Sequence, residues 1–250
     1  SAILSHKDSV TSVAWNLDGY RIITASEDEA ARVWDTNSLL ITLRGHSELV
    51  TSVACSPDGG CVVTASEDET ARVWDMSTGA QRATLTGHSG TVTSANYSPN
   101  GQQIVTAGED KTARVWDVST GRMRITLTGH SNLVTSARYS PDSSRIVTSS
   151  QDQTSRVWDA GTGKLLTTLA GHLDVVTSAC FSPDGSCILT TGADHAARIW
   201  DADTGKPLCV LLGHSNGITG ASYSPDGRWI ATSSQDHTAR VWEASSGKLI

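Results

Sequence analysis

HSGTVTSANYSPNGQQIVTAGEDKTARVWDVSTGRMRITLTGH, residues 88–130, contains one complete copy of the pattern from which the fold follows. Its alternating and β-branched runs are separated by turn signals such as Ser98-Pro99-Asn100-Gly101, in which proline and glycine stand where turns favour them. We therefore expect four short strands, at residues 92–97, 103–107, 113–116 and 124–127. Because no segment long enough for a helix shows a 3.6-residue period, the stretch predicts a four-stranded sheet.

The same pattern occurs six times in the 250 residues. Each copy contains a His, a Thr 18 residues later, an Asp 4 residues after the Thr and a Trp 6 residues after the Asp. The six sets are His6, Thr24, Asp28, Trp34; His46, Thr64, Asp68, Trp74; His88, Thr106, Asp110, Trp116; His130, Thr148, Asp152, Trp158; His172, Thr190, Asp194, Trp200; and His214, Thr232, Asp236, Trp242. One such unit cannot bury both faces of its sheet, whereas radially stacked copies bury them and leave only short edges.

Short signatures at the ends of each unit identify a family. Gly-His stands at 45–46, 87–88, 129–130, 171–172 and 213–214, and Trp-Asp stands at 34–35, 74–75, 116–117, 158–159 and 200–201. Ser-Pro-Asp-Gly is intact at 56–59, 182–185 and 224–227. With these signatures the unit resembles the WD repeat, and the resemblance covers the whole chain. It implies an all-β fold, a β-propeller of six four-stranded WD-repeat blades; the alternative is a six-blade excerpt of a larger propeller.

The phase of the repeat predicts how the chain is organised. We expect a single propeller domain over residues 1–250, with units at approximately 6–45, 46–87, 88–129, 130–171, 172–213 and 214–250. Ile250 aligns with Leu166 and Ser1 with Thr167, so the last residue is followed in phase by the first. As the resemblance implies, residues 1–5 are expected to close the ring, with the last fourth strand assembled from residues 248–250 and 2–4.

The repeated His, Thr and Asp could be taken for a catalytic triad. A catalytic site is needed once, whereas this set occurs in every unit. The resemblance implies a buried hydrogen-bonded network instead, running from the Trp indole through the hydroxyl and the His to the Asp. Buried indole, hydroxyl and imidazole groups all need partners, so we expect the six sets to be structural. The Arg two residues before each Trp is expected to form scaffold salt bridges.

Partner binding is expected where the units differ, on loops that the scaffold holds. In WD-repeat proteins the narrow face around the central channel is a frequent docking surface, and the resemblance places two variable columns there. The candidate partner-binding residues are Leu49, Leu133 and Val175, three residues after the His, and Glu27, Glu67, Glu109, Gln151 and Gln235, one residue before the Asp.

Charge at the positions one residue before and one residue after the repeated Asp is concentrated in the first three units. Glu27, Glu29, Glu67, Glu69, Glu109 and Lys111, here called the acidic crescent, carry a net charge of −4 from five acids and one base. We expect the crescent to dock a partner segment that carries Lys or Arg and an apolar anchor. The alternative is a solvated acidic rim without a partner.

Composition excludes several classes of protein. A formal net charge of −7 argues against binding to nucleic acid and anionic membranes. Apolar runs are too short for a transmembrane helix, and residues 1–10 do not resemble a signal peptide. Five irregularly spaced cysteines, with no Cys-x-x-Cys pair, indicate neither a disulfide framework nor a zinc half-site, and favour an intracellular, cytoplasmic location. His195 and His237 alone are too few for a metal site.

Function is therefore predicted as a non-enzymatic protein–protein interaction scaffold that docks partners on the propeller faces. The sequence contains no unrepeated acid, base or nucleophile set, no glycine-rich phosphate loop and no His-Glu-x-x-His motif, so we expect no catalysis, cofactor or metal. The alternatives are a reader of a specific or modified peptide at the channel mouth and a propeller domain of a larger signalling protein. Partners are expected to be proteins or peptides, basic ones among them, and the oligomeric state stays open.

Overall fold

The computed structural model describes residues 5–16, 19–35 and 38–250. In this part the regular secondary structure is entirely β, with strands arranged in six antiparallel sheets. The chain folds as two compact units, residues 1–126 and 127–250. The expected all-β class and the six blades are thereby confirmed. That the blades make up a single closed domain stays a prediction.

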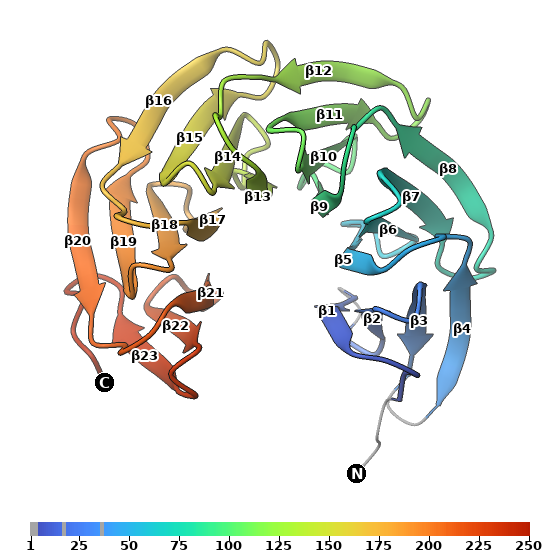
Figure 1. Ribbon diagram of the computed structural model, residues 1–250, viewed down its shortest axis with the longest axis horizontal. Helices are drawn as coiled ribbons and strands as arrows, with labels where there is room; N and C mark the ends of the chain where they lie inside the picture. Colours follow the sequence, from blue (N-terminus) through green and yellow to red (C-terminus); the bar gives the residue numbers. More distant parts are fainter. Residues whose placement is uncertain (1–4, 17–18, 36–37) are drawn as a thin grey trace. The chain divides into compact units, whose positions relative to one another are not determined.

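The first unit contains three four-stranded sheets (Figure 1). Its strands are β1 (Val10–Trp15), β2 (Ile22–Ser26), β3 (Ala30–Trp34), β4 (Leu39–Arg44), β5 (Val50–Cys55), β6 (Cys61–Ser66), β7 (Thr70–Asp75), β8 (Gln81–Thr86), β9 (Val92–Tyr97), β10 (Gln103–Gly108), β11 (Ala113–Asp117) and β12 (Met123–Leu127). Strands that follow one another in the chain pair within each sheet, and β1, β5 and β9 lie next to one another.

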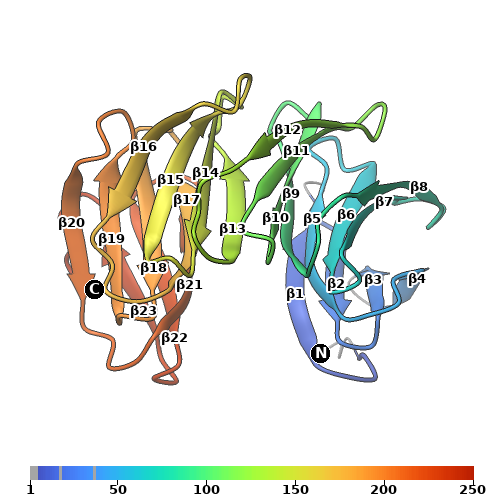
Figure 2. The ribbon, with the colours of Figure 1, turned by 45° about the horizontal axis from the view of Figure 1, so that its top comes forward.

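The second unit contains two four-stranded sheets and one three-stranded sheet. Its strands are β13 (Val134–Tyr139), β14 (Arg145–Ser150), β15 (Thr154–Asp159), β16 (Leu165–Ala170), β17 (Val176–Phe181), β18 (Cys187–Gly192), β19 (Ala196–Asp201), β20 (Pro207–Leu212), β21 (Ile218–Tyr223), β22 (Trp229–Ser234) and β23 (Ala239–Glu243). Its sheets stack face to face, and β18 contacts β21 of the next sheet (Figure 2).

Within the described residues, the sixth sheet has three strands. Its fourth position is held by a single bridge between Trp242 and Leu249, with the Ile250 amide donating to the Val241 carbonyl at 2.9 Å. Residues 2–4, which we expected to complete this strand, lie outside the described residues.

Apolar cores lie between neighbouring sheets of each unit. In the second unit, for example, Leu189 and Leu211 from one sheet pack with Ile218, Ile230 and Trp242 from the next. This arrangement explains why the β-branched runs are buried on both faces of a sheet rather than on one. It also explains the regular step of the Trp, because Trp74, Trp116, Trp200 and Trp242 each pack against the preceding blade of their own unit.

A bulge in the first strand of the sheets aims a threonine at the next blade. The register shifts between Val50 and Ser52, so Thr51 has no direct partner in the ladder, and its hydroxyl donates to the Val92 carbonyl at 2.6 Å. Thr135 and Thr177 form the same bond to the following sheet at 2.7 Å each. Bulges commonly redirect a side chain in this way.

Candidate functional site

Each blade contains the hydrogen-bonded set that its sequence repeats. In the fourth blade, the Trp158 indole N–H donates to Thr148 Oγ1 at 2.9 Å. His130 Nε2 lies 2.8 Å from the same Oγ1, and His130 Nδ1 lies 2.8 Å from Asp152 Oδ2. The Trp–Thr distance in the other five blades is 2.8 to 3.0 Å. The set therefore joins β14, β15 and the segment before β13.

The direction of the bonds follows from the donor and acceptor types. An indole N–H only donates, so Thr148 Oγ1 accepts from Trp158 and its own proton points to His130 Nε2. An ionised carboxylate only accepts, so His130 Nδ1–H donates to Asp152. The histidine is then neutral with its proton on Nδ1. Burial accordingly lowers the pKa of His130 below its ordinary value, although Asp152 acts in the opposite direction.

The aspartates of the sets are held in the ionised form. Burial by itself would raise the pKa of Asp152, but hydrogen bonds from Thr154, His130 and the Ser131 amide outweigh it and bring the pKa to about 2. Arg32 also pairs with Asp28, and Arg198 with Asp194, at 2.7 Å each. Longer ion pairs, of 3.6 and 3.3 Å, join Arg72 to Asp68 and Arg114 to Asp110.

The geometry of the set does not offer a nucleophile to a substrate. Thr64, Thr106, Thr148 and Thr190 are 0% exposed, and each hydroxyl oxygen is already between an indole and an imidazole. A reacting carbonyl would need to approach this oxygen to within about 3 Å, which the packed blade prevents. What the arrangement does chemically is satisfy three buried polar groups at once.

The two variable columns meet at one end of each blade. In every blade, the amide of the residue before the network Asp donates to the carbonyl three residues after the His. The pairs are Glu27–Ser9, Glu67–Leu49, Glu109–Thr91, Gln151–Leu133, Ala193–Val175 and Gln235–Gly217, at 2.9 to 3.0 Å. The Glu and Gln side chains are exposed, whereas Leu49, Leu133 and Val175 are partly buried.

The acidic crescent belongs entirely to the first unit. Its six side chains are all exposed and come from three successive, contacting blades. Leu49 lies beside Glu67 in the same unit. The candidate residues Leu133, Val175, Gln151 and Gln235 belong to the second unit, which adds no formal charge in these columns.

The structure shows two features that sequence reasoning missed. One is the link between blades made by the bulged threonines, whose identity in all six units was the available signal. The other is the left-handed conformation of the residue after each network Asp, with φ between 63° and 68° at Glu29, Glu69, Lys111, Gln153, His195 and His237. Glycine or Asn, which would signal such a turn, is absent from these positions.

The described residues, 5–16, 19–35 and 38–250, contain neither a metal-binding cluster nor a membrane-spanning helix. There, no three His, Cys, Asp or Glu side chains gather as they would around a metal ion. The same residues form no helix long and apolar enough to cross a bilayer.

Comparison with known proteins identifies the repeat. The family model described as WD domain, G-beta repeat matches residues 1–35, 37–75, 79–117, 121–159, 163–201 and 205–243. Comparison with curated proteins gave no match.

Proposed function

This chain belongs to the WD-repeat family, whose repeats generally mediate protein–protein interactions, and we propose that it is a non-enzymatic scaffold that docks basic partner segments on the acidic crescent. The observation that supports this is the exposure of Glu27, Glu67 and Glu109 at strand ends whose backbone is hydrogen-bonded. A rigid backbone places these charges without the entropic cost of ordering a loop when the partner binds.

Charge and apolar area have different roles in this proposal. The glutamates increase the rate of encounter with a cationic segment, an effect that added salt reduces. Leu49, partly buried beside Glu67, supplies apolar contact, which contributes more to the lifetime of the complex. Lys111 at one end of the crescent limits the region of negative charge to the first two blades and Glu109.

The experiment is an affinity capture from the native cell lysate with two baits. One is the chain itself, and the other carries Glu27→Gln, Glu67→Gln and Glu109→Gln. We expect specific proteins to be recovered with the first bait and lost with the second. A control bait carries Thr86→Ala and Thr168→Ala, which change exposed residues on the outer strands β8 and β16.

Recovery of the same proteins with all baits would contradict docking on the crescent. Loss with the control bait as well would show that binding depends on the outer strands. Recovery of one short peptide motif, lost through a single substitution, would favour the peptide-reader alternative.

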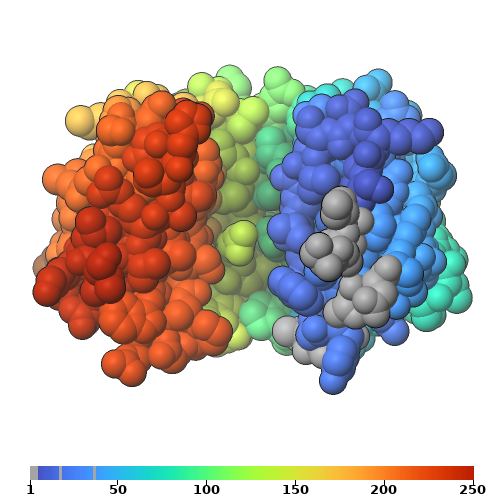
Figure 3. Space-filling view, turned by 90° about the horizontal axis from the view of Figure 1, so that it is seen from below, coloured from blue at the N-terminus to red at the C-terminus, as the bar shows by residue number. Residues whose placement is uncertain are grey.

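We further propose that the six blades form one closed domain. In the first unit, Val10 and Val13 of β1 are 50% and 62% exposed, whereas the equivalent Val50 and Val53 are 0% and 5% exposed under the preceding blade. In the second unit, Val241 of β23 is 45% exposed, whereas its equivalents are buried. Side chains of the first and last sheets are visible at the surface in Figure 3 (blue and red). Closure would bury both faces.

A further inference from the structure

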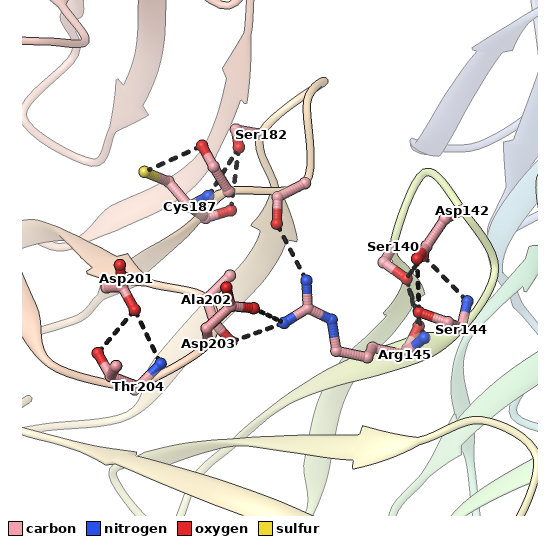
Figure 4. Close-up of polar contacts among 12 residues, drawn as sticks. Ser140, Asp142, Ser144, Arg145, Ser182, Cys187, Asp201, Ala202, Asp203 and Thr204 are labelled. Carbon is pink, nitrogen blue, oxygen red and sulfur yellow. Dashed lines mark hydrogen bonds and ion pairs between the residues drawn. The ribbon is translucent and has the colours of Figure 1, made fainter.

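One arginine of the second unit fills the space between two blades. Arg145, at the start of β14, extends to the turn after β19, where its Nη1 donates to the Ala202 carbonyl at 2.8 Å and to Asp203 Oδ1 at 2.9 Å (Figure 4). Its Nη2 donates to the Gly185 carbonyl at 3.2 Å, and its Cζ lies 5.4 Å from the centre of the Phe181 ring. The guanidinium is thus stacked on an aromatic face and bound by backbone carbonyls.

One blade further along, the same space is open. Position 187, 42 residues after Arg145, is a cysteine, whose side chain is too short to cross between the blades. The counterparts of Phe181, Gly185, Ala202 and Asp203 are Tyr223, Gly227, Ala244 and Ser245. Together with Cys187 these four line a pocket of about 540 Å³, a volume within the range of about 300–1,000 Å³ that is common for ligand sites.

The backbone of the open pocket has the same conformation as the backbone that binds Arg145 between the preceding two blades. Gly227 has a φ of 71°, and Gly185 has a φ of 75°. The Ala244 amide donates to the Arg228 carbonyl at 2.9 Å, as the Ala202 amide donates to the Ser186 carbonyl at 2.9 Å. The carbonyls of Gly227 and Ala244 therefore have the same backbone setting as the carbonyls of Gly185 and Ala202, which accept from Arg145.

The open pocket is also acidic. Asp184 and Asp226 line it, and its described lining residues include no Lys or Arg. Hydrogen bonds from the Ser182 and Ser224 hydroxyls and from backbone amides lower the pKa of both carboxyl groups, so both are ionised at neutral pH. The related pocket of the first unit, about 450 Å³ beside Cys61, differs because Arg82 lines it. The position of Arg82 is Leu208 in the fifth blade.

We propose that the pocket beside Cys187 binds an arginine side chain of a partner protein, in the place that Arg145 fills between the preceding blades. The proposal rests on the proposed scaffold function and adds a second docking point, on a different part of the chain from the acidic crescent. The partner guanidinium stacks on the Tyr223 ring, donates to the Gly227 and Ala244 carbonyls, and is balanced by Asp226. Lysine fits less well, because an ammonium has no planar fork and does not stack in this way.

The test titrates the full chain with the tripeptide N-acetyl-Gly-Arg-Gly-amide, followed by calorimetry and by the NMR shifts of Tyr223. The same peptide with citrulline, which replaces the guanidinium by a neutral urea of similar shape, is the control ligand. We expect the arginine peptide to bind about tenfold more tightly, as loss of the cation–π and charge-assisted contacts requires.

Variants at position 187 connect the binding to this pocket. Cys187→Arg supplies the arginine from the chain itself and is expected to weaken peptide binding about tenfold or more. Cys187→Ser leaves the pocket open and is expected to bind as the unaltered chain does. Cys61→Arg makes the matched change in the first unit and is also expected to leave binding unchanged. Asp226→Asn places at this exposed turn the residue that stands at the equivalent position of the third blade, Asn100, and is expected to weaken binding.

Equal binding of the two peptides, or unchanged binding by both Cys187→Arg and Asp226→Asn, would overturn the proposal. If Cys187→Arg fails to fold, Asp226→Asn alone decides. Partners captured equally by the chain and by Cys187→Arg would overturn the arginine site but leave the scaffold function standing. If Cys187→Arg abolishes peptide binding but the unaltered chain captures no partner protein, the result would support the arginine site and count against the scaffold function.

Discussion

Removal of one hydroxyl from the fourth blade gives the sharpest test of the repeated polar set. Thr148 is 0% exposed, and its Oγ1 lies 2.8 Å from His130 Nε2 and 2.9 Å from Trp158 Nε1. Thr148→Val keeps the shape of the side chain but leaves the imidazole nitrogen and the indole N–H without a partner. Each buried group left unpaired costs about 1–3 kcal/mol, so we expect the free energy of unfolding to fall by about 2–6 kcal/mol.

The measurement is urea denaturation followed by tryptophan fluorescence and far-ultraviolet circular dichroism. Thr148→Ser keeps the hydroxyl and loses only a methyl group, for an expected cost of about 1 kcal/mol. Thr168→Val makes the same chemical change as Thr148→Val at an exposed position of β16, and is expected to change stability by less than about 0.5 kcal/mol. The difference between the two valine variants isolates the effect of burial.

Trp158→Phe shows whether the hydrogen bond itself carries the effect. Its cost should be smaller in the Thr148→Val background, where the indole N–H has already lost its acceptor, with a coupling of about 1 kcal/mol. A Thr148→Val cost no larger than that of Thr148→Ser, or a coupling near zero, would refute the view that these sets stabilise the blades through their hydrogen bonds.

Three further predictions concern backbone strain, pH and closure. Gln153, with a φ of 68°, is strained for a residue with a side chain; Gln153→Gly should raise the free energy of unfolding by about 0.5–1 kcal/mol, and a lower denaturation midpoint would contradict this. Burial keeps the pKa of four histidines of the sets below 6.5 in the folded chain: His46, His88, His130 and His172. Stability should therefore be complete above pH 6.5 and fall below it as the histidines of the unfolded chain take up protons, with a second loss below pH 3.8 as Asp28 and Asp152, of pKa about 2, are protonated. Denaturation midpoints that do not change between neutral pH and pH 3.8 would count against this. Val13→Asp should cost about 2 kcal/mol or more if closure buries β1, and less than about 0.5 kcal/mol if that face stays exposed; melting temperature distinguishes the two.

The acid dependence rests on neutral imidazoles and ionised carboxylates, which act in the same direction. A neutral buried histidine resists protonation in the folded state, and an ionised aspartate that accepts hydrogen bonds resists it as well. In both cases the unfolded chain binds more protons than the folded chain, so acidification favours unfolding. Neither the histidines nor the aspartates of the repeated sets therefore offset the loss of stability at low pH.

Much of the fold was predictable because the units are near copies of one another. Ser-Pro-Asp-Gly at 182–185, for example, predicted a turn, and the structure has one there, with the Gly185 amide donating to the Ser182 carbonyl at 2.9 Å. Strand bounds were predicted to within a few residues for the same reason. Completion of the fourth strand of the sixth sheet by residues 2–4 stays a prediction, because those residues lie outside the described part of the chain.

The candidate binding residues were less predictable than the strands. The pairing of Glu67 with Leu49 through the backbone follows from the register of β5 and β6, which the sequence does not state. The pocket beside Cys187 was not predicted, because it arises from a long side chain that is missing: a cysteine stands where the preceding blade has Arg145. Only the contacts that Arg145 makes with the next blade show what that position can hold.

The repeated unit, its strands and the six polar sets follow from the sequence, because period and turn chemistry are local properties that each copy repeats. The tertiary structure, and not the pattern of the sequence, shows which residues meet between blades. It placed the bulged Thr51 against Val92 and Arg145 against Phe181, and it left a pocket where Cys187 faces Tyr223. These contacts join residues about 40 positions apart in the chain, and their geometry arises from the stacking of two sheets rather than from the pattern within either one.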